Sequence, residues 1–190
     1  MEDLAHGEEG VRPGFIGEIG VSADFTPAEK RSLEAASLVQ AQTGLPMQVH
    51  LPGWLRLGHE VLDIVEARGV GPRAVVLCHM GPSGMDQTYQ QGLAERGAYI
   101  QYDMVGMELF YADQGVQCPS DEDNARYLMQ LCDAGYSDRI LISQDIFLKS
   151  LLRSYGGPGF GHILQYFLPR LRRHGASEEL IDHLTVTNPR

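Results

Sequence analysis

The stretch GFIGEIGVSADFTPAEK, residues 14–30, contains a complete strand–loop–helix unit. Residues 15–19 are mostly apolar, which is typical of a short parallel strand buried on both faces. Thr26, Pro27 and Glu29 then form a capping-box pattern with proline at the first helical position, so we predict that a helix begins there. Glu18 lies inside the strand, and an ionised carboxylate costs several kcal/mol to desolvate unless it is paired or bound to a metal.

The same unit recurs along the chain. We predict strands at residues 15–19, 47–51, 74–79, 98–103 and 139–145. We predict helices at residues 26–44, 59–68, 86–96, 120–135, 161–174 and 177–184. Alternation of short apolar strands with helices indicates βαβ units, a parallel sheet and therefore an α/β fold. No linker-like Pro/Ser tract interrupts the pattern, so residues 1–190 are predicted to form a single domain.

Each predicted strand carries a polar side chain at or near its carboxyl end. These side chains are Glu18, His50, His79, Asp103 and Asp145. In a (β/α)8 barrel the active site is built at the carboxyl ends of the strands, whose loops face a common mouth. We therefore expect these side chains to gather around one site.

Imidazole nitrogens and carboxylate oxygens suit Zn, Mn, Fe or Co. Two such ions about 3.5–4 Å apart, bridged by a carboxylate, would generate a hydroxide nucleophile near neutral pH. The alternative for Glu18 is an ion pair with an arginine such as Arg12 or Arg73. Cys78 follows an apolar run and is interpreted as a small buried hydrophobic residue.

Composition restricts the class of protein. The formal net charge of −10 and the pI near 5.0 argue against binding to nucleic acid or to anionic membrane surfaces, which need clustered Lys and Arg. No apolar run approaches the roughly 18 residues of a membrane span. The N-terminal residues MEDLAHGEEGVRPG lack a signal-peptide pattern, and the 3 cysteines form no CxxC pair. We expect a soluble, cytoplasmic protein that acts on a small molecule.

Six motifs in the sequence resemble one known family. They are GFIGEIGVSADFTP, GLPMQVHLPG, AVVLCHMG, AYIQYDMVG, RILISQDIF and LTVTNP. Their order and spacing are similar to those of the phosphotriesterase family, within the amidohydrolase superfamily. The match is closest to its phosphotriesterase-related branch, in which a Glu bridges the two metals. This resemblance implies a (β/α)8 TIM barrel and a metal-dependent hydrolase.

The resemblance also implies roles for individual residues. Glu18 would bridge the two metal ions, and His50 and His79 would bind the more exposed ion. Asp145 would bind the more buried ion and act as general base toward the bridging hydroxide. A second set is expected to bind substrate, comprising Asp103, Tyr155 and His162.

One feature of the family is absent from this sequence. The first strand of the family carries a His-x-His pair, and no such pair occurs here. The five predicted βα units therefore resemble strands four to eight, with His6 in a segment that resembles the helix preceding strand four. We expect an N-terminally truncated, partial barrel that tightly holds at most one divalent ion, most plausibly Zn, where intact relatives hold two. A homodimer is possible.

Three functions follow from these observations. The first is hydrolysis of a small ester, lactone, amide or phosphotriester by a metal-activated hydroxide. The alternative is a catalytically inactive truncated homologue that at most binds one metal or a small molecule. The third, a metal-free barrel enzyme using a Schiff-base lysine, is poorly supported, because Lys30 falls in a predicted helix and Lys149 lies beyond a strand end.

Overall fold

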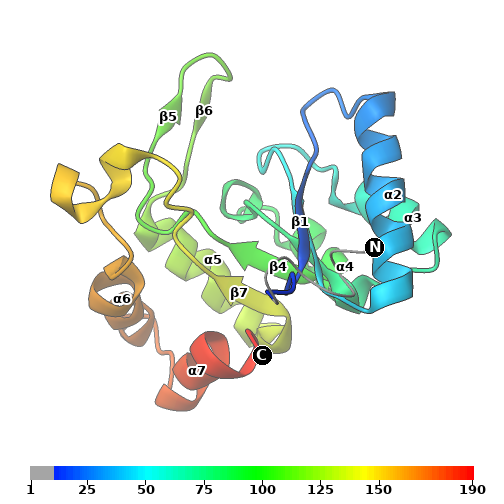
Figure 1. The fold of residues 1–190 in the computed structure, drawn as a ribbon. Helices are drawn as coiled ribbons and strands as arrows, with labels where there is room; N and C mark the ends of the chain where they lie inside the picture. The colour runs from blue at the N-terminus through cyan, green and yellow to red at the C-terminus, as the bar shows by residue number, and fades with distance from the viewer. Residues whose placement is uncertain (1–10) are drawn as a thin grey trace.

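The computed structural model describes residues 11–190, so His6 and the helix predicted around it lie outside the described residues. Its centre is a five-stranded sheet with the strand order β1-β2-β3-β4-β7. The strands are β1 (Ile16–Gly20), β2 (Met47–His50), β3 (Val75–Leu77), β4 (Tyr99–Tyr102) and β7 (Ile140–Ile142). All four neighbouring pairs are parallel, which confirms the predicted α/β fold (Figure 1).

The predicted helices are present, with the last two shorter than expected. They are α2 (Pro27–Thr43), α3 (Gly58–Ala67), α4 (Gln87–Glu95), α5 (Asp121–Asp133), α6 (Leu168–Arg173) and α7 (Glu178–Asp182). A turn of π-helix precedes α6 at Ile163–Phe167, and another follows α7 at His183–Thr187. Single 3₁₀ turns lie at Pro72–Ala74, Gly81–Ser83, Ser137–Arg139, Lys149–Leu151 and Arg153–Tyr155.

The start of α2 shows why the chain turns from strand to helix here. The Thr26 hydroxyl accepts a hydrogen bond from the Glu29 backbone N–H, and Glu29 accepts one from the Thr26 N–H at 2.6 Å. Glu29 also accepts hydrogen bonds from the backbone and the hydroxyl of Ser22. Gly44 ends the helix in a left-handed conformation, as the sequence predicted.

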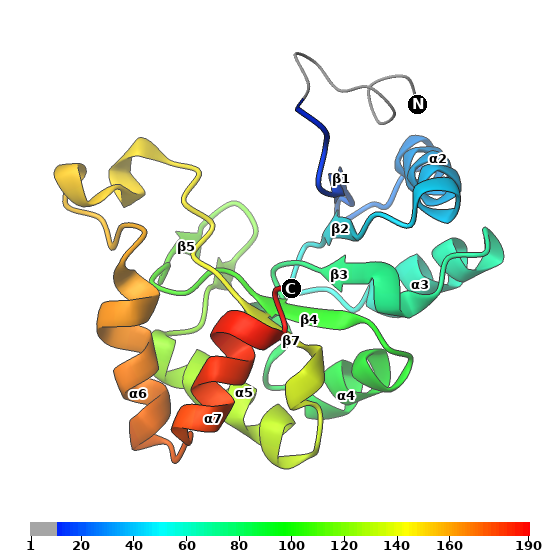
Figure 2. The ribbon, with the colours of Figure 1, turned by 60° about the horizontal axis from the view of Figure 1, so that its bottom comes forward.

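The hydrophobic core lies between the sheet and its helices. Figure 2 shows the helices following one another in an arc around the outer side of the sheet. Each of α2 to α5 contributes a fully buried leucine, and these are Leu33, Leu62, Leu93 and Leu128. They share one cluster with Val49, Leu77, Ile100 and Ile140 of the strands. Burial of this apolar layer fixes the strand ends in place.

The sheet does not close within the described residues. There β1 pairs only with β2, and β7 pairs only with β4. The inner side opens into a cavity of about 740 Å³ lined by side chains near the strand starts, among them Phe15, Gln48, Tyr99 and Leu141. The described chain is therefore part of a barrel, as predicted.

The open edge corrects one sequence prediction. Residues 15–19 were expected to be buried on both faces, but β1 is an edge strand. Phe15 is 50% exposed, and the side chain of Glu18 is 38% exposed. Glu18 thus faces an open pocket, and its charge does not have to be fully desolvated.

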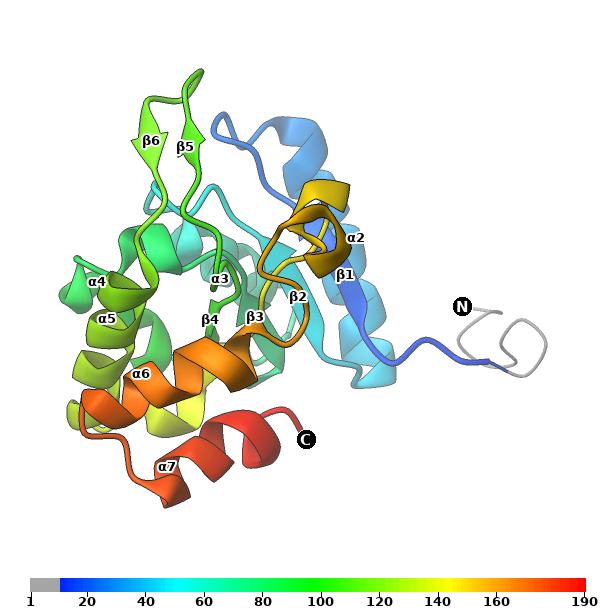
Figure 3. The ribbon, with the colours of Figure 1, turned by 90° about the vertical axis from the view of Figure 1, so that its left-hand side faces the viewer.

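A short hairpin follows β4 and was not predicted. Its antiparallel strands are β5 (Phe110–Tyr111) and β6 (Val116–Gln117). The hairpin projects from the carboxyl end of the sheet (Figure 3). Among the described residues, no helix is long and apolar enough to cross a bilayer.

Candidate metal centre

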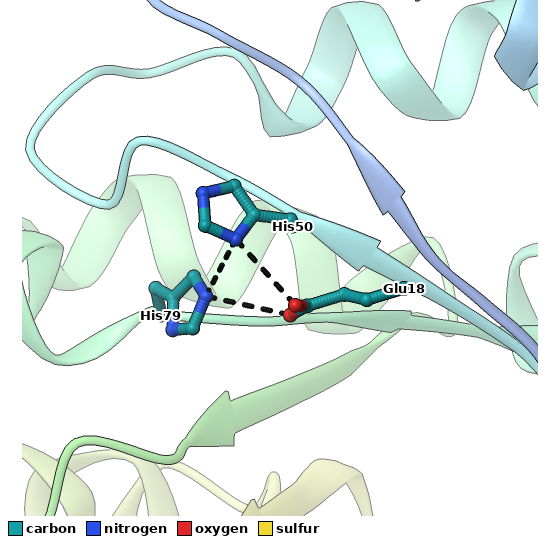
Figure 4. A group of neighbouring side chains, drawn as sticks. All are labelled: Glu18, His50 and His79. Atoms are coloured by element: carbon teal, nitrogen blue, oxygen red, sulfur yellow. Dashed lines mark hydrogen bonds and ion pairs between the residues drawn. The ribbon is translucent and has the colours of Figure 1, made fainter. Parts of the chain in front are cut away.

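Three of the predicted ligands meet at the carboxyl end of the sheet. Glu18 projects from β1, His50 is the last residue of β2, and His79 follows β3 by two residues (Figure 4). Glu18 Oε2 lies 3.5 Å from His50 Nδ1, and Glu18 Oε1 lies 3.4 Å from His79 Nε2. The two histidine nitrogens are 2.8 Å apart. The sequence therefore predicted this convergence.

The backbone around the three residues has special requirements. Gly17 has φ +130°, and a Cβ added there would lie 2.5 Å from the Gln48 carbonyl oxygen of β2. Only glycine fits this close approach, which sets the position of the neighbouring Glu18. His79 (φ 59°) and Asp145 (φ 46°) are non-glycine residues in the left-handed region, a conformation that is enriched at functional sites.

Asp103 orients His79 from below. The residue is buried, 2% exposed, and its Oδ1 lies 2.9 Å from His79 Nδ1. Both carboxylate oxygens also accept a hydrogen bond from the His79 backbone N–H. A proton on Nδ1 shared with Asp103 leaves Nε2 free to bind a cation, the arrangement common around metal-binding histidines.

The site concentrates charge. Hydrogen bonds from His50 and then His79 lower the pKa of Glu18 well below its usual range. Burial opposes protonation of His79, but its bonds to Asp103 and Glu18 outweigh burial and raise its pKa to about 10. Burial raises the pKa of Asp145, and nearby Asp103 and Glu18 raise it further, against the opposing effect of His79. The three carboxylates Glu18, Asp103 and Asp145 thus lie close to two imidazoles, those of His50 and His79.

These side chains form one wall of a pocket of about 360 Å³. The pocket is lined by Glu18, His50, Leu51, Trp54, His79, Met104, Tyr111, Asp145 and Phe147. Asp145 therefore faces the same space as the Glu18–His50–His79 group. The opposite walls are mainly apolar, with the rings of Trp54 and Tyr111 5.9 Å apart.

The donor set fits a divalent cation. One ligand atom from each of Glu18, His50 and His79 lies within 4.8 Å of the others. Two imidazoles and a carboxylate are a common three-ligand set of catalytic zinc sites, which keep a fourth position open. Asp145 does not belong to a close group of three or more among the described residues. Its roles as ligand and general base stay predictions, as does the bridging role of Glu18.

The alternative considered for Glu18, an ion pair with an arginine, is not formed among the described residues. The ion-pair partners of Glu18 among the described residues are His50 and His79, and neither Arg12 nor Arg73 pairs with it. Arg73 instead lines the cavity at the strand starts, at the far end of the sheet.

The expected substrate residues lie elsewhere. Asp103 is beneath His79 and does not line the pocket. His162 Nε2 lies 2.6 Å from Asp121 Oδ2, and Tyr155 is 58% exposed outside the pocket. Substrate contacts of Asp103, Tyr155 and His162 stay predictions. Their positions outside the pocket lining do not favour such contacts.

Sequence reasoning missed Tyr111 and Phe147 as walls of the pocket. A signal for Tyr111 exists, because the run Ala112–Gly115 has the composition of a hairpin turn. A hairpin just after a strand end would place its first strand near the mouth. Nothing comparable marks Phe147.

Comparison with known proteins extends this description. A family model described as the phosphotriesterase family matches residues 1–190. An N-acetyltaurine hydrolase from Xenopus tropicalis is 32% identical over 194 residues, covering 100% of this chain and 56% of the relative. A phosphotriesterase-related protein from Nematostella vectensis is 34% identical, covering 100% of this chain and 55% of the relative.

A solved structure is also similar. A resiniferatoxin-binding protein from Rhodobacter sphaeroides superposes with a TM-score of 0.95 at 55% identity, covering 98% of this chain and 53% of that one. The chain thus spans about half the length of the relatives that it matches.

Proposed function

Because the chain belongs to the phosphotriesterase family, in its phosphotriesterase-related branch, we propose that it carries the metal centre of a metal-dependent hydrolase. The carrying observation is the convergence of Glu18, His50 and His79 within one pocket. These three residues would hold a divalent cation, and two imidazoles with a carboxylate favour Zn.

A divalent cation held there would polarise a substrate carbonyl or phosphoryl oxygen and lower the pKa of a water molecule. The residues of the chain would do the rest. Asp103 fixes the ring of His79 through Nδ1. Asp145 faces the pocket, and its pKa is raised. Its carboxylate would take up the proton that is released when water attacks the substrate. The apolar walls would hold the substrate and exclude water.

The lining of the pocket supports a neutral substrate. None of its described lining residues is Lys or Arg, and two are carboxylates, Glu18 and Asp145. An anionic tail on the substrate would find no lysine or arginine there, whereas Trp54 and Phe147 offer apolar contact. We therefore favour a small neutral ester, lactone, amide or phosphotriester.

A second candidate is a catalytically inactive homologue that binds a metal or a small molecule. In residues 11–190 the close ligand group that contains histidine is Glu18–His50–His79, and Asp145 belongs to no such group. A single histidine group of this kind would tightly hold at most one ion.

Elemental analysis of the purified chain tests the metal centre. We expect about one Zn per chain, lost in Glu18→Ala and kept in the control Glu179→Ala, an exposed residue of α7. Two tightly bound ions in the chain, or an ion kept in Glu18→Ala, would contradict the proposal.

Hydrolysis then separates the two candidates. The metal-loaded chain should turn over a neutral lactone or aryl ester faster than an anionic N-acyl sulfonate of similar size. Metal binding without turnover of either substrate would support the inactive homologue. Faster turnover of the anionic substrate would refute the assignment of a neutral substrate.

A further inference from the structure

Cys78 lies beside the proposed metal centre but was interpreted as a packing residue. It is 1% exposed, directly before His79 and just beyond β3. Its sulfur forms a close group with one oxygen each of Glu18 and Asp103, all within 4.8 Å of one another. A thiol packed only as a hydrophobic residue would be surrounded by apolar atoms, whereas this one meets two carboxylates.

The contacts of Gln101 show that the Cys78 sulfur and an Asp103 oxygen face the same space. The single amide nitrogen Nε2 of Gln101 lies 2.9 Å from Asp103 Oδ2 and 3.7 Å from Cys78 Sγ. One donor group therefore reaches both the sulfur and the carboxylate. A cation would satisfy both atoms from a similar position, provided that the Gln101 amide rotates away.

The charge of the surroundings also favours a cation. Two carboxylates, Glu18 and Asp103, lie close to the Cys78 sulfur, and both share the single imidazole of His79 as an ion-pair partner. Carboxylates gathered around a buried group are costly unless a positive charge offsets them. A sulfur ligand beside carboxylate oxygens suits a metal that accepts both soft and hard donors, as Zn²⁺ and Cd²⁺ do.

We propose that Glu18, Cys78 and Asp103 form a second cation position, which takes a thiophilic divalent ion such as Zn²⁺ or Cd²⁺. On binding, a metal–sulfur bond forms and the thiol proton leaves to solvent. This position shares Glu18 with the proposed hydrolase centre but depends on Cys78 and not on His50. It is a weaker position than the histidine group, because the ion must displace the Gln101 amide.

Titration with Cd²⁺ tests the position through its sulfur-to-metal charge-transfer absorption in the ultraviolet. We expect this absorption in the unmodified chain and its loss in Cys78→Ser, with Cd²⁺ affinity falling at least about tenfold. The matched controls are Cys118→Ser and Cys132→Ser, whose thiols lie outside the group and should leave the absorption unchanged. Persistence of the absorption in Cys78→Ser, or its loss in a control variant, would overturn the proposal.

X-ray absorption of the unmodified chain keeps the proposal testable if Cys78→Ser fails to fold. With excess Zn²⁺ we expect a sulfur neighbour at about 2.3 Å from the metal. Metal bound by nitrogen and oxygen alone would overturn this inference while supporting the hydrolase centre. If the sulfur neighbour persists in His50→Ala, the second cation position is independent of the hydrolase centre. If the sulfur neighbour is lost in His50→Ala, that independence is overturned. No bound metal in the unmodified chain would overturn both.

Discussion

Gly17 controls the site through its neighbour Glu18. At φ +130° and with the Gln48 carbonyl oxygen 2.5 Å from an added Cβ, any side chain must push β1 away from β2. We predict that Gly17→Ala destabilises the fold by roughly 1–3 kcal/mol from conformational strain, and that it also lowers the metal content. Urea unfolding and elemental analysis measure the two effects.

Gly20 of the same strand is the matched control for this prediction. An added Cβ there meets nothing within 4 Å, and its φ is not positive. Gly20→Ala should therefore leave stability and metal content nearly unchanged or slightly raise the stability. Equal losses in the two variants would show that β1 tolerates no side chain for a reason other than this contact.

The positions of the three candidate ligands were predictable, because they depend on strand position alone. Glu18, His50 and His79 lie at or near strand ends, and parallel strands bring their carboxyl ends to one edge. The contact between Asp103 and His79 was not predictable in this way. It depends on how the side chain of Asp103, just after β4, turns beneath His79, just after β3, and that is decided by packing and not by spacing.

The first turn of α2 should be sensitive to acid. Hydrogen bonds from Thr26 and then Ser22 lower the pKa of Glu29 to about 2 from an ordinary value of 4.5. A carboxyl with a depressed folded pKa stabilises the fold above its unfolded pKa, and this contribution is lost as pH falls from about 4.5 toward 2. We predict that the melting temperature falls less between pH 6 and pH 3 in Glu29→Gln than in the unmodified chain.

Glu179→Gln, on exposed α7, provides the comparison for this pH effect. It should retain the full acid-induced fall in melting temperature. An equal fall in all three proteins would mean that the capping box does not contribute to the acid sensitivity.

His162 joins two elements that are far apart in the chain. It precedes the π-turn before α6 and contacts Asp121 at the start of α5, where Asp121 Oδ1 also accepts a hydrogen bond from the Gly106 backbone N–H. Both side chains are mostly buried. We predict that His162→Ala costs about 1–3 kcal/mol in urea unfolding, because it leaves a buried carboxylate with fewer partners.

His183→Ala is the control, since His183 pairs with the largely exposed Asp138. Exposed pairs contribute about 0–1 kcal/mol, so its effect should be small. A His162→Ala chain of unchanged stability that instead binds substrate more weakly would favour the role expected from the sequence.

Helices and strands were predicted well where their sequence pattern extends over many residues. The capping box and Gly44 define α2, and alternation defines the five strands of the main sheet. The β5–β6 hairpin escaped prediction because each strand has only two residues, too few for an alternating pattern. The shortening of α6 and α7 reflects adjoining π-turns, which sequence periodicity does not distinguish from α-helix.

At the scale of the whole described chain, residues 11–190, the main sheet is open, and this has a measurable cost. Edge strands β1 and β7 leave pairing groups free within the described residues, and half-exposed Phe15 adjoins one of them. We predict that the chain self-associates with increasing concentration, measured by sedimentation velocity. Phe15→Lys should reduce this association by adding charge at the edge.

Phe160→Lys is the control, because Phe160 is also exposed but lies in the loop before α6. It should leave the association unchanged. A discrete dimer that neither variant affects would instead support the homodimer considered from the sequence, with an interface away from the open edge.

At this scale the number of βα units was decisive. Five strands at these spacings fill only part of an eight-stranded barrel, so an open sheet could be predicted from length and alternation. The exposure of β1 could not, because the apolar pattern of residues 15–19 is typical of a strand buried on both faces, whereas three of the five residues of β1 are exposed.

The position of Trp54 gives the pocket a built-in optical reporter. It is the only tryptophan among 190 residues, and it lies in the pocket wall beside Tyr111. Its indole fluorescence therefore reports on the environment of this pocket. Filling the pocket with an apolar molecule should shift the emission to shorter wavelength, and a paramagnetic ion such as Co²⁺ or Cu²⁺ bound nearby should quench it. Occupancy can thus be followed in solution without a label, before any substrate is known.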